Sequence, residues 1–238
     1  MKCAVDLHMH SCLSPCGDDD MTPNNIVGMS FIKELDCIAV TDHNTALNLP
    51  AIKKVADAMG VVLLPGIEVT SSEEVHILTY FRDVDTAVEF GKMVYEHLLP
   101  IPNSKEIFGH QRIMNEMDEQ TGELDKLLIQ ATDLSIEEIA AACESYGGAC
   151  VAAHINRSSN SLIANLGFLP PEPVFSALEV YKAAAAPTVP TGEYKILYAS
   201  DAHNLGDISE REFFIDLPEK STEALFDYLL ECRSRVMK

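Results

Sequence analysis

Basic residues are scarce in this sequence. It has 17 lysines and arginines against 37 aspartates and glutamates, which gives a formal net charge of −20. This charge disfavours a long nucleic acid or an anionic membrane as a partner, because both require a basic surface. A surplus of carboxylates can instead be neutralised in part by bound divalent cations.

Long apolar segments and processing signals are also missing. No apolar run reaches about 18 residues, so we expect no transmembrane helix. The first residues, Met1–Asp6, lack the long apolar core of a signal peptide, and none is expected. The seven cysteines are odd in number and scattered, which favours reduced thiols. Together these features predict a cytoplasmic protein.

Two motifs of common hydrolases are absent from the sequence. There is no G-x-x-x-x-G-K-[S/T] loop, so P-loop chemistry is not indicated, and no G-x-S-x-G elbow that would carry a nucleophilic serine. The chain has 238 residues, of which 47% are hydrophobic. These values fit one large α/β domain or two small ones with a substantial core.

Predicted strands and helices alternate along most of the chain. Short apolar runs predict strands, and apolar residues three or four positions apart predict helices. Repeated strand–helix units imply a mostly parallel sheet with helices outside it. The expected strands cover 3–7, 37–40, 61–64, 75–81, 149–153, 177–181, 195–199 and 213–217, and the expected helices cover 23–35, 49–59, 162–166 and 222–236.

Residues 85–146 interrupt this alternation. Their apolar residues have helical spacing, and no strand is evident. We interpret 85–146 as a helical insertion or cap on a main domain formed by 1–84 and 147–238. Insertions on a rigid scaffold often set specificity.

Histidines gather at the ends of the predicted strands. His8 and His10 follow the first strand and point the same way, because alternate residues of a strand share a face. Of the eight histidines, only His97 and His110 lie away from the predicted strands and their ends. The carboxyl ends of parallel strands form the functional face of such folds. The candidate ligands there are His8, His10, His43, Glu68, His76, His154, Asp201 and His203.

This set is too large for one metal ion. A catalytic zinc uses about three protein ligands, so these groups suit a cluster of two or three divalent ions, with Glu68 able to bridge. The mixed nitrogen and oxygen donors suit Zn, Mn or Fe.

Five motifs in the sequence resemble those of the PHP (polymerase and histidinol phosphatase) superfamily of metal-dependent phosphoesterases. The resemblance spans nearly the whole chain in the family's order. It implies a distorted (β/α)7 barrel with a trinuclear metal site at the carboxyl ends of its strands. The sequence is most similar to the short branch that acts on nucleotides and short oligonucleotides. The motifs are Asp6–Ser11 (DLHMHS), Thr41–Asn44 (TDHN), Gly66–Val69 (GIEV), Ala153–His154 (AH) and Ser200–His203 (SDAH).

The resemblance also implies which residues hold each metal ion. Asp18 falls on an aspartate of that branch, but Asp19 replaces the glycine that should follow it, so Asp19 or Asp20 could serve instead. Asp42 is expected to orient His43. The implied sets are His8, His10, Glu68 and Asp201 for the first ion, Glu68, His76 and His154 for the second, and Asp18, His43 and His203 for the third.

The activity implied is hydrolysis of a small phosphate ester by a hydroxide that bridges metal ions. The leading substrates are a nucleotide, a nucleoside bisphosphate or a short 5'-phosphorylated oligonucleotide. Histidinol phosphate is an alternative substrate, and a non-catalytic metal-binding PHP module is the rival from another class. The sequence does not predict the oligomeric state. We expect Glu68, Asp201, His203 and Arg157 to be catalytic.

Four further residues lie near the predicted site in the sequence. Arg157 follows His154 by three residues and could bind a phosphate through two parallel hydrogen bonds. Lys182 is a weaker candidate for the same role. Cys12 and Cys16 could bind a metal ion or form a regulatory disulfide, but we favour thiols without a role in the site.

Overall fold

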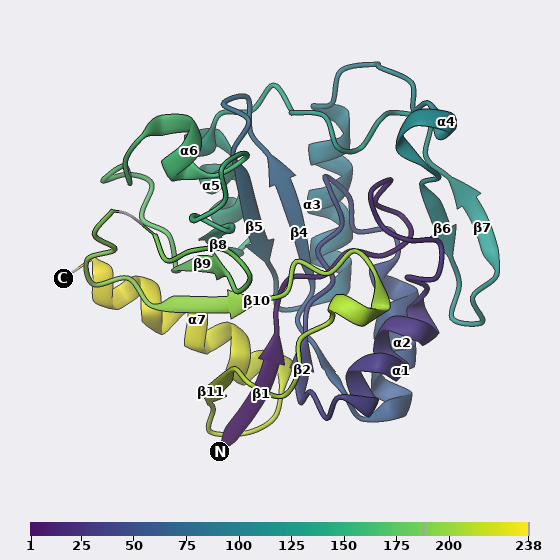
Figure 1. Cartoon of the computed structure of the whole chain (residues 1–238), viewed down its shortest axis with the longest axis horizontal. Helices are drawn as coiled ribbons and strands as arrows, with labels where there is room; N and C mark the ends of the chain where they lie inside the picture. The colour runs from purple at the N-terminus through teal and green to yellow at the C-terminus, as the bar shows by residue number, and fades with distance from the viewer. Residues whose placement is uncertain (188, 238) are drawn as a thin grey trace.

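The structure is a computed structural model that describes residues 1–187 and 189–237, and it has a mixed α/β architecture (Figure 1). The strands form two main sheets. The first has the order β11-β1-β2-β3, from Phe214–Asp216, Lys2–Asp6, Cys37–Ile38 and Val62–Leu63. The second has the order β10-β9-β8-β5-β4, from Ile196–Ala199, Ala177–Tyr181, Ala149–Ala152, His76–Tyr80 and Gly66–Thr70.

The strands that pair in parallel are separated in the sequence by a helix or a long crossover. β1, β2 and β3 pair in parallel, and so do β8, β9 and β10. β5 runs antiparallel to both of its neighbours, β4 and β8. Only 71–75 separate β4 from β5, which is too short for a parallel crossover and leaves a hairpin as the possible connection. The expectation of a mostly parallel sheet is therefore wrong around β5, and it is also wrong at β11, which pairs antiparallel with β1.

Two isolated parallel bridges join the sheets. Met9 pairs with Ala202 between the segments that follow β1 and β10, and His43 pairs with Glu68 between the segment after β2 and β4. In Figure 1 the arrowheads of β1 and β10 end close together near the centre of the molecule. The described strands thus approach a ring at the level of these bridges, and closure into one seven-stranded barrel stays a prediction.

Local sequence signals set the ends of several helices. Pro23 opens α1 in its first turn, Gly60 ends α2 with φ +72°, and Ser135 and Glu138 form a capping box on α5. None of the helices within 1–187 and 189–237 has the length and apolarity needed to cross a membrane. The helices are α1 (Pro23–Ile32), α2 (Leu49–Met59), α3 (Val84–Glu96), α4 (Lys105–Phe108), α5 (Ile136–Ser145), α6 (Leu162–Leu166) and α7 (Thr222–Val236), with a 3₁₀ turn η1 at Leu205–Asp207.

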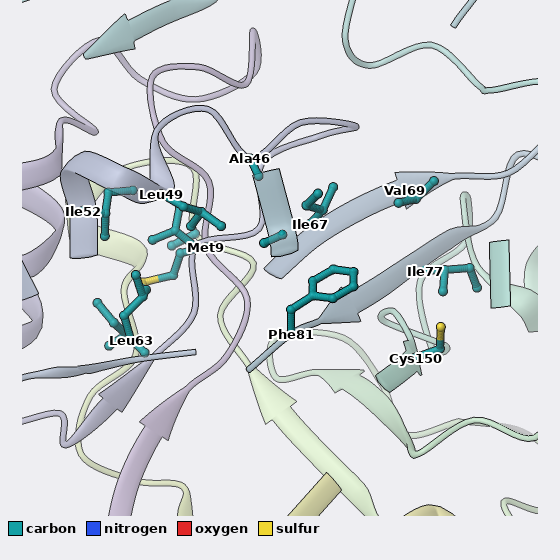
Figure 2. Packing of buried hydrophobic residues seen from close by; sticks show 14 of the residues in the cluster. Met9, Ala46, Leu49, Ile52, Leu63, Ile67, Val69, Ile77, Phe81 and Cys150 are labelled. Atoms are coloured by element: carbon teal, nitrogen blue, oxygen red, sulfur yellow. The ribbon is translucent and has the colours of Figure 1, made fainter. Parts of the chain in front are cut away.

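Apolar side chains fill both sides of the sheets. In Figure 2, Leu49 and Ile52 of α2 lie near Met9 and Leu63, while Phe81 lies beside β4 and β5. A second buried cluster joins alternate strand residues such as Val5 and Val151 to the inner face of α7. Because apolar packing surrounds the strands, their polar carboxyl-end residues are held on a rigid scaffold.

The segment 85–146 is not purely helical. It contains a two-stranded hairpin, β6 (Arg112–Met114) and β7 (Gln120–Glu123), at the right edge of Figure 1. The expectation of no strand is therefore wrong. Ile113 and Met117 have the spacing of a buried helix face, but Met117 lies in the hairpin turn and is 73% exposed. α3 contacts α2 and β4, and α5 contacts β5 and β8. The division into 1–84 plus 147–238 and an insertion stays a proposal.

Candidate metal centre

Eight polar side chains meet where the strands of the two sheets end. Most of them follow a strand or lie near its carboxyl end. His76 is different because it is the first residue of β5, but antiparallel pairing brings the amino end of β5 to that same edge. The structure brings together the sequence-predicted residues His8, His10, His43, Glu68, His76, His154, Asp201 and His203.

Glu68 lies at the centre of this cluster. Its side chain is 1% exposed, and each carboxylate oxygen faces ring nitrogens. One carboxylate that faces five imidazoles is suited to bridge metal ions. On Oε1 the contacts are His76 Nδ1 (2.8 Å), His154 Nε2 (3.1 Å) and His8 Nε2 (3.3 Å), and on Oε2 they are His43 Nδ1 (3.1 Å) and His10 Nε2 (3.2 Å).

Asp201 forms a second contact point for the first two histidines. Its Oδ1 lies 3.3 Å from His8 Nε2 and 3.2 Å from His10 Nε2. Donor atoms of these three residues lie within 4.8 Å of one another, and the same holds for His43, Glu68 and His76. The arrangement provides two compact nitrogen–oxygen donor sets.

Glu179 in β9 is a site residue that the sequence analysis missed. Its Oε2 accepts a hydrogen bond from His8 Nδ1 at 2.9 Å and one from the backbone N–H of His154 at 3.3 Å. With Nδ1–H donated to Glu179, the Nε2 atom of His8 faces Glu68 and Asp201. A carboxylate partner of this kind fixes the ring and raises its basicity as a ligand.

Asp42 acts on a different histidine from the one expected. It accepts hydrogen bonds from the Ser11 backbone N–H and from the hydroxyls of Ser11 and Ser14. Ser14 Oγ lies 3.0 Å from His10 Nδ1 and accepts the backbone N–H of His43. The Ser14 hydroxyl therefore links Asp42 to the ring of His10. It links Asp42 to His43 only through the backbone N–H of that residue, so Asp42 does not orient the His43 ring.

Arg157 reaches the metal centre. Its Nη1 donates to Asp201 Oδ2 at 2.7 Å, and its guanidinium lies 4.2 Å from the centroid of the Tyr181 ring. His203 is held nearby, where Nδ1 donates to the backbone oxygen of Asp201 at 2.8 Å. By contrast, Lys182 pairs with Glu212 at 2.5 Å.

Asp18 does not join the cluster in the manner expected. Its side chain is exposed, and Oδ1 accepts the backbone N–H of Asp20 at 2.9 Å. Asp19 pairs with Arg112 at 3.1 Å. The donor group formed around His43 and His203 in the described residues contains Cys16.

The two histidines that the sequence placed away from the strand ends lie outside the site. His97 pairs with Asp133 at 2.6 Å, and His110 pairs with Glu123 at 3.1 Å. Both rings are more than a third exposed, as expected for surface residues.

Burial and opposite charges compete over the protonation of the cluster. Burial alone would lower the pKa of His10, but the nearby carboxylates of Asp201 and Glu68 outweigh it and raise the pKa to about 9. Burial opposes ionisation of Asp201 as well, yet His8 and His10 hold its pKa well below the usual range. At the rim, burial and then the charge on His10 lower the pKa of His203 to about 4.

Two site residues have left-handed backbone conformations that favour glycine. His154 has φ +26° directly after β8, and Asp201 has φ +50° shortly after β10. Non-glycine residues in this region cost of order 1–3 kcal/mol and persist where the surroundings hold them. The fold thus retains local strain at the positions that aim these two side chains inward.

The residues present fit divalent metal ions. Several ring nitrogens and carboxylate oxygens are buried in the cluster without a hydrogen-bond partner, although such atoms are normally satisfied. Carboxylates and imidazoles crowded this closely are what metal ions bind, since ligation satisfies the lone pairs and neutralises the charge. The atoms that face the centre are His43 Nδ1, Glu68 Oε2 and Asp201 Oδ1. His154 Nδ1 is also without a partner, but that ring turns its Nε2 atom toward Glu68.

Comparison with known proteins gives one short sequence match. No known family profile matches the chain. Over 84 residues it is 31% identical to the 5'-3' exoribonuclease Rnm of Salmonella typhimurium, a match that covers 33% of this chain and 28% of that one.

Similarity to solved structures extends over nearly the whole chain. Endonuclease Q of Pyrococcus furiosus aligns with a TM-score of 0.70 and 19% identity, over 95% of this chain and 55% of that chain. A protein of Bifidobacterium adolescentis described as a metal-dependent phosphoesterase aligns with a TM-score of 0.62 and 19% identity, over 97% of this chain and 96% of that chain. A two-domain protein of Bacteroides vulgatus that contains a PHP-like metal-dependent phosphoesterase aligns with a TM-score of 0.59 and 17% identity, over 98% of this chain and 64% of that chain.

These similarities agree with the motifs in the sequence. An exoribonuclease, an endonuclease and a phosphoesterase all hydrolyse phosphoric esters, which is the reaction class predicted. The chain spans about half of endonuclease Q and less than a third of the exoribonuclease. It has the fold of the PHP-like metal-dependent phosphoesterases, the family that its motifs resemble.

Proposed function

We propose that this protein is a metal-dependent phosphoesterase that hydrolyses a small phosphate ester. The observation that carries the proposal is the convergence of five imidazoles on the buried carboxylate of Glu68. A structural core has no use for such a cluster, because burying charged and polar groups costs free energy unless they are bound to a partner. The two linked sheets would correspond to the distorted barrel of the family.

The ligands divide among two or three divalent ions of Zn, Mn or Fe. Ions held there would supply Lewis acidity and activate water for attack on phosphorus. Glu179 and Ser14 orient His8 and His10 so that their Nε2 atoms face the centre. We assign His8, His10, Glu68 and Asp201 to the first position, Glu68, His76 and His154 to the second, and His43 and His203 to the third.

Arg157 is placed to bind the phosphate of the substrate. Its guanidinium contacts Asp201 at the centre and is about one third exposed, so a phosphate oxygen can reach it. A planar guanidinium can donate two parallel hydrogen bonds to a phosphate. Stacking on Tyr181 restricts the side chain to this orientation.

A cavity beside Arg157 can hold the remainder of the substrate. It has a volume of about 360 Å³ and is lined by 155–158, by Ile163 and Ala164 of α6, and by 185–187. Small-molecule sites commonly occupy a few hundred Å³. The cavity supports a nucleotide, a nucleoside bisphosphate or the end of a short oligonucleotide as substrate.

The acidic character of the chain argues for short substrates. A net charge of −20 repels a long polyanion. Endonuclease Q has been crystallised with a 27-mer duplex, so long DNA belongs among the substrates to be tested. The non-catalytic alternative is disfavoured because eight of the expected donor residues converge on one centre.

Two variants test the proposed site. His8→Ala and Glu68→Ala should each lose bound metal and phosphatase activity, because each removes a central donor. His97→Ala, which removes an exposed histidine outside the cluster, should retain both. Metal content and phosphate release would be measured on the same preparations. Full activity in either central variant would contradict the site, and bound metal without turnover of any phosphate ester would favour the non-catalytic module.

A comparison of two substrates separates the enzyme alternatives. The proposal expects faster turnover of a nucleoside bisphosphate than of histidinol phosphate at equal metal loading. The reverse preference would support the histidinol-phosphate phosphatase alternative.

A further inference from the structure

The loop between β1 and α1 brings a thiol to the histidine cluster. Cys16 Sγ and one ring nitrogen each of His10, His43 and His203 lie within 4.8 Å of one another. A thiol and imidazoles in this number form a donor set typical of zinc and other borderline-soft ions. All seven cysteines lie in the described part of the chain, where six are buried and Cys16 is exposed at the rim of the cluster.

His43 provides an independent indication that this group binds a ligand. The residue is 6% exposed, and its Nδ1 has no hydrogen-bond partner even though Glu68 Oε2 lies 3.1 Å away. Its ring centroid is 4.5 Å from that of His10, so the imidazole points into the cluster. A buried ring nitrogen without a hydrogen-bond partner is explained by a bound cation. His43 belongs both to the donor group that contains Glu68 and to the one that contains Cys16, so its ring links the two positions.

The backbone holds Cys16 in place. Ser14 N–H donates to Ser11 O at 3.1 Å, and Gly17 N–H donates to Ser14 O at 2.8 Å, which makes two successive tight turns. The backbone N–H of Asp18 then donates to the carbonyl of His203 at 2.8 Å. These bonds fix the thiol beside His203 and direct the Asp18 carboxylate to its own loop.

We propose that Cys16, rather than Asp18, completes the third metal position together with His43 and His203. On ligation the S–H bond breaks, the proton passes to solvent, and a sulfur lone pair forms the bond to the metal. Because thiolates favour softer ions, this position should select zinc or ferrous iron over manganese. The inference rests on the proposed function, since it concerns one position of the same metal centre.

Cobalt substitution tests the sulfur ligand directly. The metal-stripped protein is loaded with Co²⁺, and its near-ultraviolet spectrum is recorded beside its metal content. Wild-type protein should show a thiolate-to-cobalt charge-transfer band, and Cys16→Ser should lose it together with about one ion per chain. Cys12→Ala changes a neighbouring thiol outside the donor group, and it should keep the band.

Two further variants separate Cys16 from Asp18. Asp18→Asn should keep the charge-transfer band and the full metal content. Cys16→Asp replaces the sulfur ligand with an oxygen ligand. After loading with equal amounts of zinc and manganese, this variant should contain a larger share of manganese than the wild type. A cobalt-loaded wild type without the band, or a Cys16→Ser variant that retains it, would overturn the assignment. Failure to bind any cobalt would instead overturn the proposed function itself.

Discussion

Glu179 shows how a residue outside the ligand motifs can set the properties of the metal centre. Its carboxylate fixes His8 through Nδ1 and also accepts the backbone N–H of His154. Replacing such partners of a ligating histidine typically lowers metal affinity or activity about 10- to 100-fold. We therefore expect Glu179→Gln to weaken metal binding by that factor, as measured by competition with a chelator. The exposed Glu89→Gln should have no effect, and a Glu179→Gln variant with wild-type affinity would contradict the role.

The raised pKa of His10 predicts that the metal-free protein loses stability as the pH rises. The pKa of His10 is about 9 in the folded chain, against a usual value of 6.5. The stabilisation from charged His10 is therefore complete below pH about 6.5 and is lost as the pH rises through about 9. Urea unfolding of the metal-free protein across this range measures the effect. His10→Asn should flatten the profile, and an equally steep profile in that variant would rule out His10 as its source.

Most individual site residues could be predicted from the sequence, because they lie in short motifs next to apolar strands. Glu179 could not, since nothing around it in Ala177–Tyr181 resembles a motif. One signal was available, namely a lone carboxylate within a buried apolar strand. A role for Cys16 could not be settled from the sequence, because its proximity to His43 and His203 depends on how the loop folds, which spacing alone does not reveal.

At the scale of elements, the loop before α1 depends on Gly17. A Cβ atom at this position would lie 2.4 Å from the carbonyl oxygen of Ser11, so the loop would have to move. We expect Gly17→Ala to lower the free energy of unfolding by about 1–3 kcal/mol, the usual effect of overpacking. Chemical denaturation of the variant measures this change.

Gly28 in α1 provides the matched control. A Cβ atom there would meet nothing within 4 Å, so Gly28→Ala should be neutral or raise stability by up to about 1 kcal/mol through helix propensity. Equal effects of the two substitutions would show that the close approach at Gly17 does not constrain the loop.

Elements with clear end signals were predicted accurately. α2 ends where Gly60 stops it, and α6, β9 and α7 have the bounds expected from their apolar patterns. The β6–β7 hairpin was missed because its apolar residues fall by chance at helical spacing. Strand direction at β5 was missed because it depends on the length of the connection and on pairing with β8, which is distant in the sequence.

At the scale of the whole molecule, the charge of −20 predicts an unusual response to salt. Proteins that bind nucleic acids through basic surfaces lose affinity as salt increases. Here screening should relieve repulsion, so the KM for a short 5'-phosphorylated oligonucleotide should fall between low and physiological ionic strength. The KM for a mononucleotide should change less. Steady-state kinetics at several salt concentrations would measure both, and a rising KM for the oligonucleotide would indicate a basic binding surface.

Metal dependence of phosphate release tests the central claim most directly. The protein would be stripped of metal and reloaded separately with manganese, zinc or ferrous iron. Adenosine 3',5'-bisphosphate, a 5'-mononucleotide and a short 5'-phosphorylated oligonucleotide would serve as substrates, with the stripped protein as the control. The convergence of imidazoles on Glu68 predicts phosphate release from at least one substrate only after reloading. Equal release by the stripped protein, or no release from any substrate at full metal loading, would contradict the assignment of a metal-dependent phosphoesterase.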